Sequence, residues 1–249
     1  MSNLIKSSEE IEEMAVGGRL LAIFLEKLSK EAKIGVTTEK LNLFTEELFK
    51  EANVKSNFKN YGGFPAALCA SVNEVVVHQP PSSYALKEGD ILTLDLGFIR
   101  HGFHTDAATT IPIGKISPSA QNLLLVTKES LRKGIQAAFP GNHLGDIGYE
   151  IQRHVEKQGL TIVRDLCGHG IGRDLHEFPN VLNRGSLGEG MILRAGMVFC
   201  IEPMVSLGSP EIVLGQDKLS YLTADRSLSA HFEHMIVIEE NGPRILSKL

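Results

Sequence analysis

Four stretches of the chain place apolar residues about every three or four positions, which is the period of an amphipathic helix. The first two cover residues 8–32 and 37–53, and the other two cover residues 117–139 and 143–159. Ser8 is followed by two glutamates, which predicts a helix N-cap and an acidic first turn. β-rich apolar segments follow each pair of helices, so each half of the chain predicts helix, helix and then strands.

Two of the β-rich segments resemble each other. In GDILTLDLG and in GMVFCIEPM a carboxylate lies six residues after the first glycine, Asp95 in one and Glu202 in the other. This repeat predicts a pseudo-twofold α+β fold with an antiparallel sheet and helices on its outer face. We expect one catalytic domain over 1–249, made of halves of about 1–112 and 113–249; a chance match of the spacing is the alternative.

A predicted hairpin brings two aspartates face to face. Residues 91–98 alternate between two faces of a strand, and Asp95 lies on the less apolar face. If Arg100 and His101 form the turn, Asp95 lies directly opposite Asp106 with β-carbons about 5 Å apart. Two ionised carboxylates at that distance repel, so one takes up a proton or a cation lies between them. A pair of solvated surface aspartates is the alternative.

Further acids and histidines occur in similar surroundings. Glu202 and Glu233 lie in apolar, β-rich runs, where an unpaired charge is costly to bury, and an arginine or lysine partner is the structural alternative. His169 lies in the glycine-dense run 168–172, which we interpret as a loop that allows close approach of a ligand. Capping or packing is the alternative for this histidine. His78 ends an apolar run before an extended exit toward a proline.

Four carboxylates and one imidazole together carry four negative charges, which match two divalent cations. Oxygen-rich ligation with one histidine suits Mn²⁺, Fe²⁺, Co²⁺ or Zn²⁺. It argues against a thiolate-type metal site. Two cations held close together activate a water molecule and stabilise a tetrahedral intermediate. These residues therefore predict a site for two divalent cations that activates a water molecule.

The composition excludes several other classes of protein. The 249 residues carry a net charge of −5, which argues against binding of nucleic acid, and no apolar run reaches the about 20 residues of a membrane span. The three cysteines are far apart, which argues against a disulfide framework or a structural zinc site. The acidic N-terminal segment lacks the apolar stretch of a secretory signal. We therefore expect a cytoplasmic protein with no membrane or nucleic-acid partner.

Five segments in this order resemble the motifs of the type I methionine aminopeptidases, members of peptidase family M24 with the creatinase-like pita-bread fold. They are SVNEVVVH, GDILTLDLGFIRHGFHTDAATT, CGHGIGRDLHEFP, GMVFCIEPM and DRSLSAHFEHMIVI. The resemblance reaches the first helix, and the length resembles the short bacterial form. It implies two divalent cations (cobalt, manganese, iron or zinc) held by five residues: Asp95, Asp106, His169, Glu202 and Glu233. Asp106 and Glu233 would bridge the two cations.

The resemblance also implies a reaction, the removal of the initiator methionine from nascent proteins whose second residue is small. Glu202 would act as general acid and base, His176 would stabilise the oxyanion, and His78 would hydrogen-bond near the scissile amide. The methionine side chain would enter an apolar pocket formed by five residues: Phe58, Tyr61, Phe64, Cys69 and Leu175. The N-terminal peptides of nascent proteins would be the partners of a monomer, and docking on the ribosome stays open.

The chain departs from the usual family pattern around the substrate and not at the ligands. The departures are at Gly62, Val77, Gln79 and Pro80, and no tryptophan occurs in residues 215–222 to close the pocket. We therefore expect methionine to be preferred by a reduced margin. The alternatives are an X-Pro peptidase of the same fold, a non-catalytic relative and a metal-free creatinase-type amidinohydrolase. Retention of all five ligands disfavours the last two.

Overall fold

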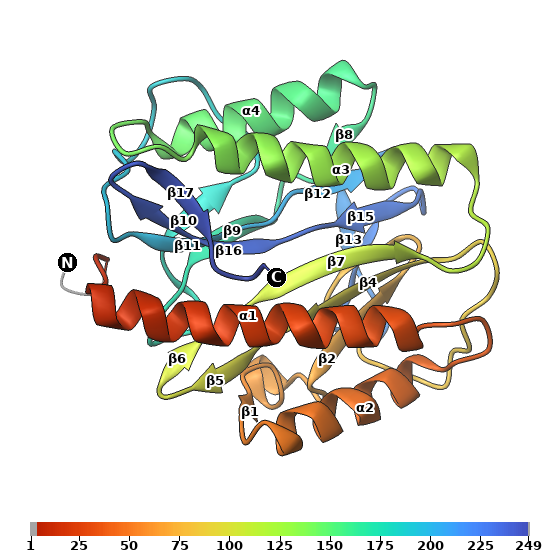
Figure 1. The fold of residues 1–249 in the computed structure, drawn as a ribbon. Coiled ribbons are helices and arrows are strands. Elements are labelled where there is room, and N and C mark those ends of the chain that lie inside the picture. Colours follow the sequence, from red (N-terminus) through yellow and green to blue (C-terminus); the bar gives the residue numbers. More distant parts are fainter. Residues whose placement is uncertain (1–3, 249) are drawn as a thin grey trace.

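The computed structural model describes residues 4–248. It contains both helices and strands (Figure 1). The long helices in that range are α1 (Ser8–Glu31), α2 (Thr38–Glu51), α3 (Pro118–Ala137) and α4 (Leu144–Lys157). A single short 3₁₀ helix, η1 (Tyr61–Gly63), is present in the same range. The helices predicted from apolar periodicity are therefore confirmed.

The strands are short and pair antiparallel wherever a pairing is described. Those before α3 are β1 (Lys55–Ser56), β2 (Leu68–Val72), β3 (Val75–Val77), β4 (Ile91–Leu96), β5 (Phe98–Arg100), β6 (Phe103–His104) and β7 (Ala107–Pro112). Those after α4 are β8 (Thr161–Ile162), β9 (Cys167–Gly170), β10 (Glu177–Leu182), β11 (Val198–Ile201), β12 (Met204–Ser206), β13 (Ile212–Leu214), β14 (Tyr221–Thr223), β15 (Ser229–His231), β16 (His234–Glu239) and β17 (Gly242–Ile245).

The first helix begins one residue earlier than its predicted cap implies. Its N-cap is Ser7 and not Ser8, because the Ser7 hydroxyl accepts a hydrogen bond from the Glu10 backbone N–H at 3.3 Å. The Glu10 carboxylate in turn accepts from the Ser7 backbone N–H at 3.0 Å, which completes a capping box. This closed pair of bonds fixes where the N-terminal segment enters the helix.

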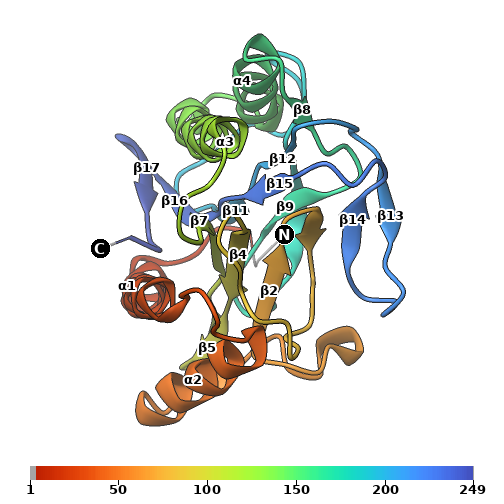
Figure 2. The ribbon, with the colours of Figure 1, turned by 90° about the vertical axis from the view of Figure 1, so that its right-hand side faces the viewer.

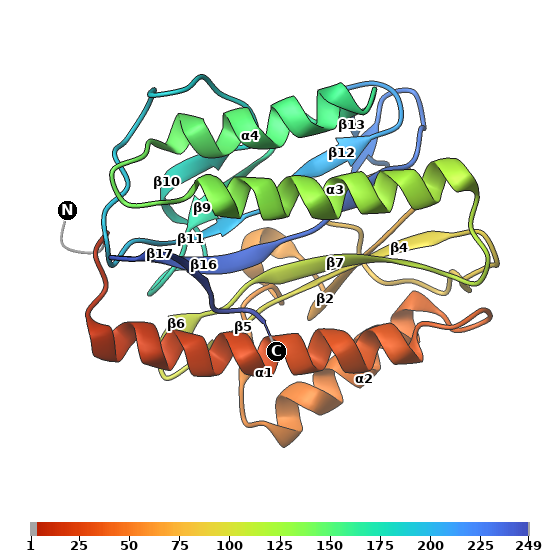
Figure 3. The same cartoon turned by 45° about the horizontal axis from the view of Figure 1, so that its top comes forward.

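The two halves repeat the order of helix, helix and strands. In the first half β2, β4 and β7 form a three-stranded sheet, and in the second half β10, β9, β11, β16 and β17 form a five-stranded sheet. Helices α1 and α3 run side by side along one side of the strands, and the β13–β14 hairpin lies on the other side (Figures 2 and 3). The predicted α+β class, with antiparallel sheets and helices outside them, is confirmed.

Each half has its own apolar core under its helices. Leu92, Leu94 and Leu96 of β4 are fully buried against side chains of α1 and α2. In the second half α3 and α4 pack on each other, and Ile147 and Ile151 of α4 are fully buried. The alternate positions of β4 are thereby left to face away from the helices, and Asp95 occupies one of them.

A backbone hydrogen bond joins the two halves at the centre. The N–H of Glu233, just before β16, donates to the carbonyl of Ala108 in β7 at 2.9 Å. Elements from both halves therefore meet beside Asp106 and Glu233.

The predicted register of the hairpin is wrong. The two turn residues are His101 and Gly102, which both have positive φ angles of 47° and 80°, as a two-residue type I′ turn requires. Asp95 consequently pairs with Ala108 rather than with Asp106. The glycine at the second turn position, which adopts a left-handed conformation easily, favours this turn over one formed by Arg100 and His101.

None of the helices in residues 4–248 combines the length and the apolar character that a bilayer span would need.

Candidate metal centre

The acids and the histidine named from the sequence come from five different places in the fold. Asp95 lies in β4, and Asp106 lies between β6 and β7 in the same hairpin. His169 lies in β9, Glu202 directly follows β11, and Glu233 directly precedes β16. All five residues are at least nine-tenths buried. The first half thus supplies two of these groups and the second half three.

Four of these residues take part in two overlapping groups of atoms that could ligate a metal, and Glu202 belongs to neither group. One oxygen each of Asp95, Asp106 and Glu233 lie within 4.8 Å of one another. A second group, of His169, Cys200 and Glu233, satisfies the same limit. Glu233 belongs to both groups. Its position therefore allows one carboxylate to contribute to two neighbouring cation sites.

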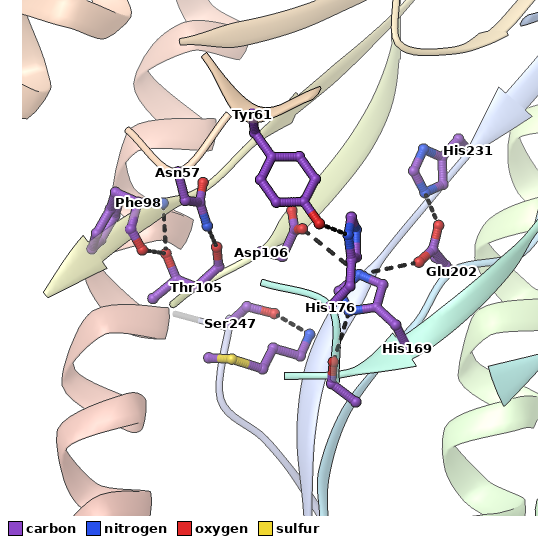
Figure 4. A network of polar contacts seen from close by, with 12 residues as sticks. Asn57, Tyr61, Phe98, Thr105, Asp106, His169, His176, Glu202, His231 and Ser247 are labelled. Atoms are coloured by element: carbon purple, nitrogen blue, oxygen red, sulfur yellow. Dashed lines mark hydrogen bonds and ion pairs between the residues drawn. The ribbon is translucent and has the colours of Figure 1, made fainter. Parts of the chain in front are cut away.

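His169 lies between two of the carboxylates. Its Nε2 is 3.8 Å from an oxygen of Asp106 and 3.6 Å from Oε1 of Glu202 (Figure 4). Its Nδ1 is 3.0 Å from the backbone carbonyl of Gly170. A carbonyl only accepts hydrogen bonds, so Nδ1 carries the proton and Nε2 presents a lone pair to the acids. This is the tautomer that a metal-ligating histidine needs.

His169 belongs to a strand and not to the predicted glycine loop. β9 is sandwiched between β10 and β11, and the flanking glycines allow their backbones to approach closely. A β-carbon on Gly168 would lie 2.2 Å from the Cys200 carbonyl oxygen, and one on Gly170 would lie 2.5 Å from that of Phe178. The glycines therefore serve strand packing and not approach by a ligand.

Burial raises the pKa of every acid in the cluster. The pKa of Asp95 is raised to about 7 by burial. Burial, and then the charges of neighbouring carboxylates, raise the pKa values of Asp106, Glu202 and Glu233 well above their ordinary range. Four acids this close cannot all ionise unless positive charge lies among them.

The donor set fits divalent cations. Asp95 Oδ1, Asp106 Oδ1 and Glu233 Oε1 are buried and accept no hydrogen bond within the described chain. None of the described residues that line the surrounding cavity is a lysine or an arginine, which removes the predicted structural alternative of a basic partner. Burial of a carboxylate oxygen without a hydrogen-bond donor costs free energy of folding, unless a cation lies beside it.

The cluster lies at the base of a cavity of about 430 Å³. Its lining includes every site residue predicted from the sequence: Phe58, Tyr61, Phe64, Cys69, His78, Asp95, Asp106, His169, Leu175, His176, Glu202 and Glu233. An apolar wall beside a carboxylate cluster can hold an aliphatic side chain while the attached polar groups reach the acids.

His176 and His78 both line the cavity. Nδ1 of His176 lies 2.7 Å from the Tyr61 hydroxyl, and its ring meets that of His169 edge-on with centroids 4.4 Å apart. Burial lowers the pKa of both His176 and His78, so both rings are neutral near pH 7. The predicted strand end is confirmed, since β3 ends at Val77, but the predicted extended exit is wrong at His78, whose φ is 61°. That left-handed conformation turns the chain at the end of β3.

The departures from the family pattern fall into two groups. Gly62, Val77 and Leu219 line the cavity, the last from the segment 215–222. Gln79 instead braces β2: its side-chain oxygen accepts from the Val72 N–H at 2.8 Å. Only the first group can touch a substrate directly.

Sequence reasoning missed several cavity residues. His231 is the most notable, because it is buried and its Nε2 lies 3.6 Å from Oε2 of Glu202 (Figure 4). The segment SAHFEHM contains it two positions before Glu233, so alternation along a strand could have pointed to it. Cys200, two positions before Glu202, does not line the cavity, but its Sγ belongs to the group formed with His169 and Glu233.

Comparison with known proteins gives a consistent result. The model of metallopeptidase family M24 matches residues 12–240. A methionine aminopeptidase of Clostridium perfringens is 45% identical over 244 residues, which cover 98% of each chain. The crystal structure of methionine aminopeptidase from Thermotoga maritima has a TM-score of 0.96 at 43% identity, over 98% of this chain and 99% of that one.

A more distant likeness concerns the fold alone. The prolidase of Pyrococcus horikoshii has a TM-score of 0.79 at 20% identity, over 99% of this chain but 64% of its own. The predicted pita-bread architecture is confirmed by these structural matches. The chain belongs to metallopeptidase family M24, among the methionine aminopeptidases.

Proposed function

We propose that the chain removes the initiator methionine from the N-terminus of nascent proteins when the second residue is small. The observation that carries the proposal is a buried cluster of four acids and a histidine, at the base of a largely apolar cavity. The names and identities of the relatives support the substrate class. The N-terminal peptides of nascent proteins are thus the partners, and we propose that the protein acts as a monomer in the cytoplasm.

Two divalent cations would be held by five residues: Asp95, Asp106, His169, Glu202 and Glu233. The two overlapping ligand groups and their shared Glu233 support a pair of cations, and the oxygen-rich donor set suits cobalt, manganese, iron or zinc. When bound, such a pair polarises a peptide carbonyl and lowers the pKa of a water molecule. Asp106 and Glu233 are proposed as the bridging carboxylates.

The protein's own groups then handle the substrate and its protons. Glu202 takes a proton from the attacking water and delivers it to the leaving amine nitrogen, as a general base and then a general acid. His176 donates from Nε2 to the developing oxyanion, because its Nδ1 is engaged by Tyr61. His78 hydrogen-bonds near the scissile amide.

Specificity for methionine would come from the apolar wall. The rings of Phe58, Tyr61 and Phe64, together with Cys69 and Leu175, form a lining that suits an unbranched, polarisable thioether. Leu219 closes this wall in place of a large aromatic ring. The smaller side chain leaves more room for other aliphatic side chains. We therefore propose a methionine preference with a reduced margin.

The test couples metal content to release of methionine. The purified protein is assayed with Met-Ala-Ser before and after dialysis against a chelator, and the bound metals are counted by elemental analysis. We expect methionine release that requires about two equivalents of a divalent cation. Full activity without metal, or cleavage of X-Pro substrates alone, would overturn the proposal.

A further inference from the structure

His231 is buried beside Glu202, and its backbone is held firmly. It ends β15, is 2% exposed and pairs with Met204 of β12. Its N–H donates to the hydroxyl of Thr110 at 2.9 Å, and that hydroxyl donates to the His231 carbonyl at 2.7 Å. The Thr93 hydroxyl lies 2.8 Å from that of Thr110 and extends the network into β4. The ring therefore has little freedom to leave the cavity.

The imidazole ring itself lacks a hydrogen-bond partner. Neither Nδ1 nor Nε2 of His231 makes a hydrogen bond within the described chain, although both atoms are buried. A buried polar group in this state calls for a partner that satisfies it. The Glu202 carboxylate lies beside Nε2, with Oε2 at 3.6 Å.

Glu202 is flanked by two imidazoles on its two oxygens. Oε1 faces Nε2 of His169 at 3.6 Å, and Oε2 faces Nε2 of His231 at the same distance. Its backbone carbonyl accepts from the Asn183 side chain at 3.0 Å, so the main chain is fixed and the carboxylate orientation depends on its neighbours. A small rotation of either side chain closes the 3.6 Å gap to a hydrogen bond.

We propose that His231 is a positioning residue for Glu202, donating a hydrogen bond from Nε2 to Oε2 so that Oε1 is presented beside His169. The inference rests on the proposed function, because it gives Glu202 a role as metal ligand and proton carrier. It needs only an N–H on Nε2, which the corresponding neutral tautomer carries. An oriented carboxylate binds a cation more tightly and receives a proton in a defined direction.

Two substitutions separate this role from packing. His231→Gln keeps a side-chain N–H near the position of Nε2, and His231→Phe keeps a planar ring without any donor. Metal-free protein is titrated calorimetrically with Mn²⁺, and kcat and KM are measured with Met-Ala-Ser. Thermal unfolding of the metal-free variants reports the fold independently of metal and substrate.

We expect His231→Phe to bind Mn²⁺ about 10–100-fold more weakly, the range for loss of a group that orients a ligand. Its kcat should fall with KM nearly unchanged, and its metal-free unfolding temperature should stay near that of the parent. His231→Gln should restore most of the Mn²⁺ affinity and of kcat. If His231→Phe does not fold, His231→Leu is compared with His231→Gln in the same way.

The inference is wrong if His231→Phe binds Mn²⁺ as the parent does, or if the Gln and Phe variants lose affinity equally. Loss of a complete equivalent of Mn²⁺ in both variants would make His231 a direct ligand and would also overturn it. The proposed function fails separately, in the parent protein, if the parent neither binds Mn²⁺ nor releases methionine.

Discussion

The hydroxyl oxygen of Tyr61 lies 2.7 Å from Nδ1 of His176, so a residue of the substrate wall holds the ring proposed to stabilise the oxyanion. A hydroxyl that donates to Nδ1 leaves the ring proton on Nε2. In the proposed mechanism His176 donates from Nε2, so the Tyr61 hydroxyl is the donor to Nδ1 and holds this tautomer from outside the metal cluster.

Tyr61→Phe should lower kcat by about tenfold, which corresponds to the free energy of one hydrogen bond. KM should change little, because the aromatic ring that lines the cavity is retained. Steady-state kinetics with Met-Ala-Ser measure both constants. A variant with the parent's kcat would show that the hydroxyl does not position His176.

His176→Ala and His169→Ala should fail in different ways. Loss of the proposed oxyanion donor His176 should lower kcat by about 100-fold or more while metal content stays near that of the parent. Loss of His169, whose Nε2 faces Asp106 and Glu202, should lower metal content. Elemental analysis beside kinetics separates the two; equal metal depletion in both variants would place His176 among the ligands.

Asp106→Ala should abolish binding of the metal pair, because Asp106 is a proposed bridging carboxylate. The fold should survive, since the apolar face of β4 packs away from the cluster under α1 and α2. Asp165→Ala, which removes an exposed acid outside the cavity, is the matched control. Calorimetric titration with Mn²⁺ and circular dichroism measure the two properties. Two tightly held cations in Asp106→Ala would contradict the assignment.

Features that depend on local chemistry could be predicted from the sequence. The helices follow from apolar periodicity, and Asp95 lies on the face of β4 opposite Leu92, Leu94 and Leu96, as alternation implies. The resemblance directed attention to residues from both halves, and these line one cavity.

Features that depend on contacts distant in sequence could not be predicted. The hairpin register is an exception, because it follows from a local signal: Gly102 at the second turn position favours a turn of His101 and Gly102 over one of Arg100 and His101. The strand conformation of His169 comes from β10 and β11 on either side of β9. Likewise, only the assembled fold brings His231 to Glu202 and Tyr61 to His176.

Leu219→Trp should sharpen the preference for methionine. Leu219 lies between β13 and β14 in the sequence and lines the cavity. An indole ring at this position would fill space that leucine or norleucine substrates can use. We expect the ratio of kcat/KM for Met-Ala-Ser over Leu-Ala-Ser to rise about tenfold, within the range for one methylene group in an apolar pocket. Leu214→Trp, on the exposed part of β13, is the control. Equal rates for Met-Ala-Ser and Ala-Ala-Ser in the parent would contradict a methionine pocket.

Metal-free protein should lose stability as the pH rises from about 4 to about 7. The pKa of Asp95 is about 7 in the folded protein against 3.8 as its ordinary value, so in that window the folded state keeps a proton that the unfolded chain releases. Stability therefore falls with rising pH, and bound Mn²⁺ should remove the fall. Thermal unfolding across the window tests this. Asp95→Asn should reduce the slope of the metal-free profile without abolishing it, because the pKa values of Asp106, Glu202 and Glu233 are also raised; an unchanged slope would contradict the prediction.

The hydrogen bond from Glu233 to Ala108 has a consequence for the synthesis and folding of the chain. Because the carboxylates on either side of this bond come from segments far apart in the chain, their contact forms late in folding, after the local helices and hairpins. A chain that is still being synthesised has Asp95 and Asp106 but lacks Glu233, and it cannot assemble the complete cluster. On the proposed ligand set, hydrolytic activity therefore requires that both halves have been made and have come together.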